Sequence, residues 1–181
     1  MKRKIDPYQK NNLTLRLLEE CDLPYTLAWR NHESHRCWFI STEIISLETH
    51  VVWFNRYKEL DTDFIFIVQD KQGNRCGQLS IYELDDKNKC AKFGRFLVNP
   101  CCANLGIMKA ACGIGLALAR DVLQISELIL EVKQNNCKAV HIYQSSGFVS
   151  KEITSDGLII MELNLIYNNL ISSNGVLNRV V

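Results

Sequence analysis

The sequence lacks several features that mark large classes of proteins. Its 21 Lys and Arg residues are balanced by 20 Asp and Glu residues, so it has no excess charge with which to attract nucleic acid. It has no apolar run of the roughly 18 residues that a membrane helix needs. The basic residues near the start are followed by no apolar stretch of the kind found in secretion signals. We therefore expect a cytoplasmic protein whose partners are neither nucleic acid nor membrane.

Cysteine, by contrast, is plentiful. The eight cysteines are scattered through predicted strands and helices, and Cys101 and Cys102 are adjacent. Because no export signal is recognisable, we interpret them as free thiols. The 181 residues, 47% of them hydrophobic, suffice for one domain with a full core. We expect an N-terminal extension over 1–12, the domain over 13–165 and a tail over 166–181.

Hydrophobic periodicity predicts an α/β fold with a mixed sheet. Apolar residues that alternate or run together indicate strands, and those that recur every three or four residues indicate helices. The predicted strands are 13–17, 64–68, 76–84, 91–98, 128–132, 149–153 and 158–165, and helices begin near residues 19, 46, 108 and 136. Strand, helix and strand in the second half imply a right-handed parallel crossover, whereas the first half forms an antiparallel meander.

The loop after strand 91–98 is a candidate anion site. Gly106 lies in this loop, and unpaired amides at the start of a helix attract negative charge. In an open sheet a ligand binds where strands end and the connection changes direction, which here is at residues 97–99. Lys109 adds a positive charge suited to a pyrophosphate. An ordinary connecting loop with one convenient glycine is the alternative that this segment leaves open.

Asn136 and Tyr143 form a second constellation. Asn136 suits the N-cap of a helix, and Tyr143 lies two turns further on the same face. A phenol in this position can protonate a departing thiolate, because phenols and thiols have comparable acidity. A tyrosine that serves only the core is the general alternative.

These segments together resemble the coenzyme A-binding half of GNAT N-acetyltransferases. The resemblance rests on the strand, Gly106 loop, helix and strand, followed by Asn-x-x-Ala-x-x-Ile-Tyr-x-x-x-Gly-Phe from Asn136 to Phe148, and its order and spacing cover residues 13–165. It implies the GNAT fold, in which strand 91–98 splays from strand 128–132 and leaves a V-shaped slot. Acetyl-coenzyme A would occupy this slot as co-substrate, and the family implies no metal.

The resemblance also implies roles for single residues. The pantetheine arm would pair with the backbone of Leu97, Val98 and Asn99, Asn136 would contact the arm, and Tyr143 would be the general acid. The pyrophosphate would lie on the loop formed by Ala103, Asn104, Leu105, Gly106, Ile107 and Met108, next to Lys109. The family usually has Gln or Arg in place of Ala103 and Gly or Ala in place of Met108. A non-catalytic domain that kept the fold and lost its cofactor is therefore one alternative.

A third constellation concerns the acceptor. Trp29-Arg30-Asn31 and His50-x-x-Trp53-Phe54 resemble GNAT enzymes that acetylate nucleotide-linked amino sugars. Aromatic rings can stack on a base or sugar, and arginines can pair with a diphosphate, although the aromatic residues suit helix anchors equally well. The expected acceptor-binding residues are Trp29, Arg30, Asn31, Arg36, Phe39 and Trp53.

A base must take a proton from the substrate ammonium before attack. Glu83, late in its strand, is our first candidate; His50, with an ordinary pKa of about 6.5, is the second, and a water chain is a third route. The spacing His32-x-x-His35-x-Cys37 has no second ligand pair, so we expect no metal.

We therefore expect an N-acetyltransferase, a monomer or homodimer, in which a small-molecule amine attacks acetyl-coenzyme A directly in a ternary complex. Acetylation of a protein N-terminus, as ribosomal-protein acetyltransferases perform it, is the alternative within the same chemistry.

Overall fold

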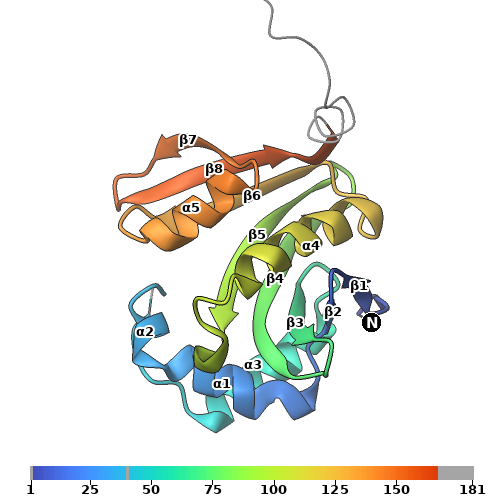
Figure 1. Ribbon diagram of the computed structural model, residues 1–181, viewed down its shortest axis with the longest axis vertical. Coiled ribbons are helices and arrows are strands. Elements are labelled where there is room, and N and C mark those ends of the chain that lie inside the picture. The colour runs from blue at the N-terminus through green and yellow to red at the C-terminus, as the bar shows by residue number, and fades with distance from the viewer. Residues whose placement is uncertain (1, 40, 167–181) are drawn as a thin grey trace, which may run out of the picture.

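One twisted sheet organises the molecule. This computed structural model describes residues 2–39 and 41–166, and in them eight strands run in the order β1-β2-β3-β4-β5-β6-β8-β7 (Figure 1). Every neighbouring pair is antiparallel except β5 and β6, which are parallel. The mixed sheet is therefore confirmed, with its parallel pair at the predicted crossover.

The elements follow the predicted order closely. The strands are β1 (Tyr8–Lys10), β2 (Leu13–Leu17), β3 (Phe64–Asp70), β4 (Arg75–Asp85), β5 (Cys90–Val98), β6 (Glu127–Lys133), β7 (Val149–Ile153) and β8 (Leu158–Asn164). The helices are η1 (Glu20–Asp22), α1 (Leu23–Asn31), α2 (Glu33–Arg36), α3 (Leu47–Glu59), η2 (Pro100–Cys102), α4 (Ile107–Asp121) and α5 (Cys137–Ser145). Strand β1 was not predicted; it lies within the expected N-terminal extension and pairs with β2.

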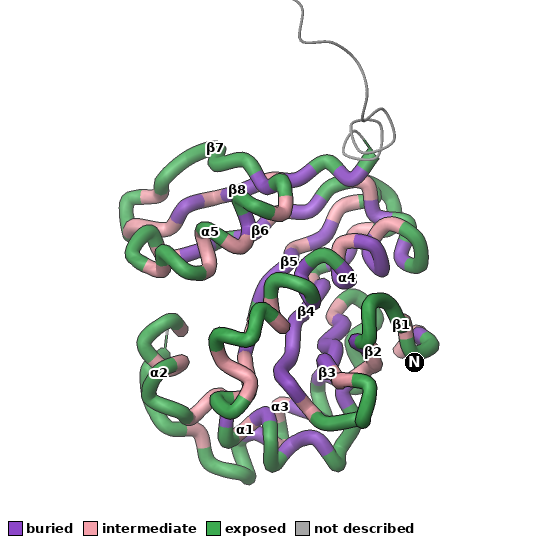
Figure 2. The backbone as a smooth tube through the Cα atoms, in the orientation of Figure 1, coloured by how far each residue is buried: buried purple, intermediate pink, exposed green. Residues whose placement is uncertain are grey.

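Helices cover both faces of the sheet, as the alternation along β3 shows. Phe64, Phe66 and Val68 enter the core cluster beneath α4 and α5, whereas Ile65 and Ile67 enter a second cluster with α1 and α3. Successive side chains of a strand point to opposite faces, so a strand buried on both sides reads as a continuous apolar run. Figure 2 shows β3 and β4 as largely buried and β7 as exposed throughout.

Asp22 fixes the start of α1 against the sheet. Its carboxylate is fully buried and lies 2.7 Å from the guanidinium groups of both Arg16 on β2 and Arg75 on β4. Burial acts to raise the pKa of Asp22, but hydrogen bonds from Arg16, Arg75 and the Glu19 N–H outweigh it, so the pKa is lowered. The carboxylate therefore stays ionised and joins three elements.

The cysteines, the search for membrane helices and the C-terminal tail were also subjects of prediction. All eight cysteines are free thiols, as predicted. Within the described part of the chain, no helix is both long and apolar enough to span a bilayer. Of the predicted tail, residues 167–181 lie outside the described residues.

Candidate active site

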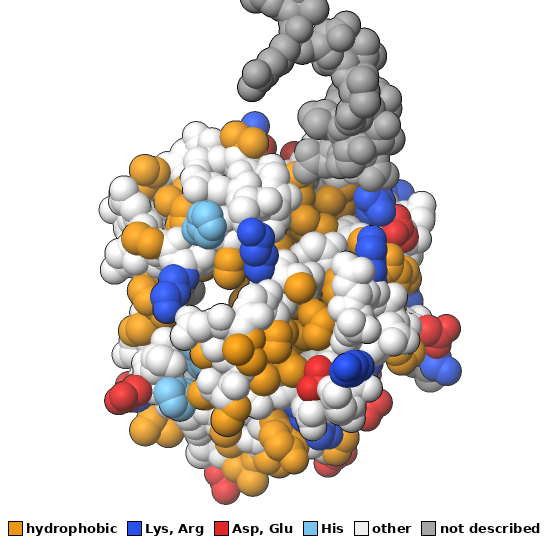
Figure 3. Space-filling model, viewed as in Figure 1, with side chains coloured by type: hydrophobic (Ala, Val, Ile, Leu, Met, Phe, Trp, Pro, Cys, Tyr) orange, Lys and Arg blue, Asp and Glu red, His pale blue; other side chains and the backbone are white. Residues whose placement is uncertain are grey.

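A slot opens in the sheet between β5 and β6. The two strands pair only where Cys90–Lys92 meets Glu127–Ile129, and they diverge beyond these residues (Figure 1). The space-filling view shows the surface hollowed between α5 and the loop before α4 (Figure 3). The diverging edges present backbone N–H and C=O groups that can bind an extended ligand, as an open sheet edge does. The two strands thus diverge as expected for a V-shaped slot.

A β-bulge shapes the β5 wall of the slot. Between Gly94 and Leu97, β5 has one residue more than the partner strand β4. Arg95 takes up the bulge with a left-handed φ of 53°. Its guanidinium lies 3.7 Å from the Tyr82 ring centroid, and Nη1 donates to both carboxylate oxygens of Asp63 at 2.8 and 3.0 Å. Bulges bend a strand and redirect its groups, so this one re-aims the β5 backbone beside the slot.

The loop from Ala103 to Gly106 leads from the slot to α4. Asn104 and Gly106 both have left-handed φ values, of 62° and 73°. Gly106 is the N-cap of α4, and no side chain caps the helix. The first amides of α4 are therefore available to an anion. In the same segment Leu105 is exposed, and Ala103 and Ile107 are half-buried.

Met108 lies over the sheet, beside β4. A Cβ on Gly77 would come within 2.9 Å of the Met108 sulfur and would overlap the carbonyl oxygen of Leu97. Met108 is larger than the Gly or Ala that the family usually has at this position. Its side chain packs beside Gly77, where β4 has no side chain. Nothing in the sequence linked Met108 to Gly77.

Asn99 fixes the end of the β5 wall. Its backbone N–H donates to the Cys76 carbonyl (2.8 Å) and its side-chain amide donates to the Arg75 carbonyl (2.9 Å). Its Oδ1 accepts from the Cys101 N–H at 3.1 Å. Before it, Leu97 is buried and Val98 half-buried. The side chain of Asn99 is thus occupied within the fold, and its expected contact with the cofactor stays a prediction.

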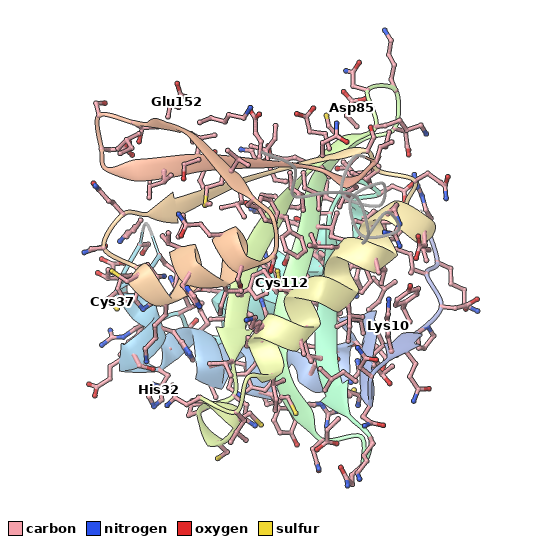
Figure 4. All side chains as sticks on the ribbon, turned by 45° about the horizontal axis from the view of Figure 1, so that its top comes forward. Lys10, His32, Cys37, Asp85, Cys112 and Glu152 are labelled. Carbon is pink, nitrogen blue, oxygen red and sulfur yellow. The ribbon has the colours of Figure 1, made fainter. Side chains whose placement is uncertain are left out.

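A groove of about 490 Å³ runs along the first half of α4. Figure 4 shows Lys10, from the β1–β2 hairpin, beside this helix. The groove begins at the amide end of α4 and has a lysine from each side, so it suits an anionic ligand. Its lining residues are Lys10, Asn11, Gly106, Lys109, Ala110, Gly113 and Ile114.

Tyr143 lies on the α5 side of the slot. Asn136 caps α5 as predicted, with Oδ1 accepting from the Ala139 N–H at 3.3 Å. The Tyr143 ring is buried edge-to-face against Phe96 of β5 (5.6 Å) and Phe148 (5.8 Å). Burial raises its pKa, so the phenol keeps its proton at neutral pH. Its hydroxyl makes no hydrogen bond to any described residue, and so it is free to serve a ligand.

Glu83 belongs to a group of three charges at the narrow end of the slot. Lys92, at the last paired position of β5 and β6, lies 3.0 Å from Glu83 and 3.3 Å from Glu131. Hydrogen bonding to Glu83, opposed by burial and supported by Glu131, raises the pKa of Lys92. Lys92 therefore stays an ammonium, and the carboxylates are the groups able to accept a proton. Glu131 was missed from the sequence, because 48 residues separate it from Glu83 (131 − 83).

His50 lies between α1 and α3. It is buried, its Nε2 is 3.0 Å from Thr26 Oγ1, and its ring stacks on Trp53 with centroids 4.9 Å apart. Burial lowers the pKa of His50, which favours the neutral ring. These contacts make His50 part of the packing between α1 and α3. None of them is with Glu83, Lys92 or Glu131.

The residues expected to bind the acceptor divide into two sets. Trp29 is buried in the core of α1 and α3, and half-buried Trp53 stacks on Tyr57 as well as on His50. Asn31 joins α1 to the segment before α3, because its side chain both donates to the Ile45 carbonyl (2.8 Å) and accepts from the Ile45 N–H (2.9 Å). These residues hold α1, α3 and the segment before α3 together.

Arg30 and Arg36, with Phe39, form the second set. The Arg30 guanidinium lies 4.0 Å from the Phe39 ring centroid and donates to the Ser41 carbonyl at 2.6 Å, and Arg36 donates to the Thr42 carbonyl at 3.2 Å. Nη1 of Arg30 and Nε of Arg36 are buried without a hydrogen-bond partner in the described chain. Burial, and then the neighbouring Arg36, lower the pKa of Arg30. No described carboxylate pairs with either arginine.

In one group of side chains among the described residues, the possible ligand atoms lie close enough together to hold a metal ion. It comprises Glu19, Cys21 and Asp22. The Asp22 carboxylate already forms ion pairs with Arg16 and Arg75, which fix the start of α1 against the sheet. These ion pairs account for the group without a metal ion.

Comparison with known families assigns the fold. The family described as the acetyltransferase (GNAT) domain matches residues 12–149. The chain belongs to the GNAT acetyltransferase family. It is an acyltransferase that moves acetyl from acetyl-coenzyme A to an amine, as its sequence predicted. The GNAT fold and the resemblance to the GNAT family are thereby confirmed, whereas the relatives reported below are named for acceptors other than amino sugars.

The relatives bear two kinds of name. The spermidine N(1)-acetyltransferase of Vibrio cholerae is 25% identical over 141 residues, 78% of this chain and 81% of the relative. The putative ribosomal N-acetyltransferase YdaF of Bacillus subtilis is 25% identical over 170 residues, 88% of this chain and 91% of the relative. Among solved structures, the Vibrio cholerae spermidine N-acetyltransferase in complex with CoA and spermine matches with a TM-score of 0.81 at 22% identity, over 87% of this chain and 98% of that one. At this identity the structural match carries the fold alone.

Proposed function

We propose that this GNAT enzyme acetylates the primary amine of a nucleotide-linked amino sugar. The observation that carries the proposal is the pair of guanidinium groups of Arg30 and Arg36. Each has a buried N–H without a partner in the described chain, and neither has a described carboxylate beside it. Buried donors without partners are costly, and a diphosphate would satisfy both arginines with charge-assisted bonds.

The slot supports acetyl-coenzyme A as the donor. Its pantetheine arm would lie along the β5 edge at Leu97 and Val98, and its pyrophosphate would lie on the uncapped amides after Gly106. The groove lined by Lys10 and Lys109 continues from that point. A relative of the same fold was crystallised with CoA.

In the reaction, the free amine attacks the thioester carbonyl and the carbon–sulfur bond breaks. Backbone N–H groups at the β5 bulge would stabilise charge on the carbonyl oxygen. Tyr143 would give its proton to the departing thiolate, since burial keeps the phenol protonated. The amine proton would pass to Glu83 or Glu131, and direct transfer in a ternary complex needs no covalent enzyme intermediate.

The relatives support polyamines as a second candidate acceptor. Enzymes named for spermidine are 25–26% identical to this chain, and Glu83 and Glu131 would attract a cationic amine. Arg30 and Arg36 would repel such an acceptor. A peptide N-terminus, suggested by the ribosomal relative, is the remaining candidate.

A panel of acceptors tests the proposal. Release of free coenzyme A is measured with a uridine-diphosphate-linked 4-amino sugar, with the same amino sugar lacking the nucleotide, with spermidine and with short peptides. We expect the nucleotide-linked sugar to have a kcat/KM at least tenfold above that of the free sugar. Faster turnover of spermidine or a peptide would replace the proposal with the corresponding alternative.

A further inference from the structure

Lys133 joins the two sides of the slot. It is the last residue of β6, the wall opposite β5. Leu128, Leu130 and Val132 of this strand are buried in the core cluster that contains α4 and α5, so Lys133, one position out of phase, projects to the other face of the sheet. There its Nζ donates to the Cys37 carbonyl at 2.8 Å and to the Phe39 carbonyl at 3.3 Å.

The two carbonyls belong to the segment that follows Arg36 and whose Phe39 ring contacts Arg30. Residues 37–39 follow α2, more than 90 residues before Lys133 in the chain. Figure 4 shows Cys37 close to the start of α5, on the same side of the molecule as β6. Phe39 is the ring over which Arg30 lies at 4.0 Å. Lys133 thus holds the backbone against which Arg30 is placed.

The connection between α2 and α3 is held by side chains from both of the helices before it and from β6. Its described residues, 37–39 and 41–46, lie in no helix or strand, and α2 itself has four residues. Near α3 it is held by Asn31, through the two bonds to Ile45. In the middle Arg30 and Arg36 donate to the Ser41 and Thr42 carbonyls, and directly after α2 Lys133 is the side chain that ties it to β6. An ammonium on two carbonyls is a charge-assisted contact and is stronger than a neutral one.

We propose that Lys133 is a positioning residue for the acceptor. It fixes the connection between α2 and α3 against β6, so that Arg30 and Arg36 face a substrate whose donor lies in the slot that β6 bounds. The inference rests on the proposed function, because it assigns the acceptor to this connection. The sequence offered no signal for it.

Kinetics of Lys133→Met provide the test, because methionine keeps much of the stem and removes the donors. We expect the KM for the acceptor to rise roughly tenfold, with kcat and the Kd of acetyl-coenzyme A changed less than about twofold. Lys133→Arg, which retains a charged donor, should recover most of the loss. Lys71→Met, at an exposed lysine in the β3–β4 turn, is the matched control and should match the wild type in every parameter.

Amide hydrogen exchange separates this proposal from the proposed function. Without any substrate, Lys133→Met should speed amide exchange at residues 37–39 and 41–45, and Lys133→Arg should not. If the wild type acetylates none of the amines, the proposed function fails, whereas the exchange result still tests the bridge. Unchanged exchange together with an unchanged acceptor KM would overturn the role of Lys133, and so would a loss confined to acetyl-coenzyme A binding.

Discussion

The proposed donor side of the slot offers a ligand mainly backbone groups, and the proposed acceptor side offers mainly side chains. On the donor side the working groups are largely backbone: the diverging edges of β5 and β6, a bulge at Arg95 and the uncapped amides after Gly106. On the acceptor side they are side chains on short helices and an irregular connection, with Arg30 and Arg36 at their centre.

This difference would allow members of the family to keep one donor and differ in acceptor. Backbone groups are retained whenever the fold is retained, whatever the side chains are. Loops and their side chains change without cost to the sheet. Relatives near 25% identity therefore do not fix the acceptor, which must be inferred from the arginines and carboxylates of this chain.

The largest effect is expected at Tyr143, the proposed general acid on the donor side. Tyr143→Phe should lower kcat roughly 100- to 1,000-fold, because the thiolate would leave without a proton. The Kd of acetyl-coenzyme A, measured by calorimetry, should stay within about twofold of the wild type. A variant that turns over normally but no longer binds acetyl-coenzyme A would show that the phenol is a binding group.

A smaller effect is expected on the acceptor side. Replacing Arg30 and Arg36 together by Met should raise the KM for a nucleotide-linked acceptor roughly 10- to 100-fold, because two charge-assisted contacts are lost. The KM for the same sugar without its nucleotide should not change, and Arg56→Met on the exposed side of α3 serves as control. An equal loss for both acceptors would mean that the arginines serve the fold.

Gly106 tests the backbone character of the donor side. Gly106→Val places a β-branched residue at a φ of 73°, a strain of about 1–2 kcal/mol, and should weaken acetyl-coenzyme A binding about tenfold. Gly73 in the β3–β4 turn has a φ of 82° and equally open surroundings, so Gly73→Val is a matched control. It should lower the melting temperature without changing the Kd. The comparison breaks down if both variants bind acetyl-coenzyme A like the wild type.

The smallest effect concerns His50 and the frame of the acceptor side. Burial lowers its pKa below the ordinary 6.5, so the unfolded chain binds the proton first as pH falls. Its contribution to stability is present above pH 6.5 and is lost as pH falls through the lower folded pKa. Thermal melts should therefore show a midpoint lower by a few degrees at pH 5 than at pH 7.5. His50→Gln should flatten this dependence, and an unchanged slope would assign it to other groups.

Local patterns predicted the strands, the crossover and the cap at Asn136, because each is set by residues near one another in the sequence. The splay of β5 from β6 also followed from the resemblance. The contacts that decide side-chain roles were not accessible in this way. Lys133 meets Cys37, Met108 meets Gly77, and Glu131 meets Lys92 across dozens of residues, and periodicity has no information on such pairs. For the same reason Trp29 looked equally suited to a ligand and to the core, where it lies.

The short ladder between β5 and β6 has a thermodynamic consequence. Three residue pairs join the meander of the first half to the last three strands, so beyond them the facing backbone groups of β5 and β6 are left without a partner strand. Acetyl-coenzyme A lying there would form backbone hydrogen bonds in place of those that β5 and β6 do not make with each other. It would bind the folded state and not the unfolded chain. At a hundredfold excess over its Kd such a ligand adds about 2.7 kcal/mol to the free energy of unfolding. The lifetime of the enzyme would then follow the supply of its own co-substrate.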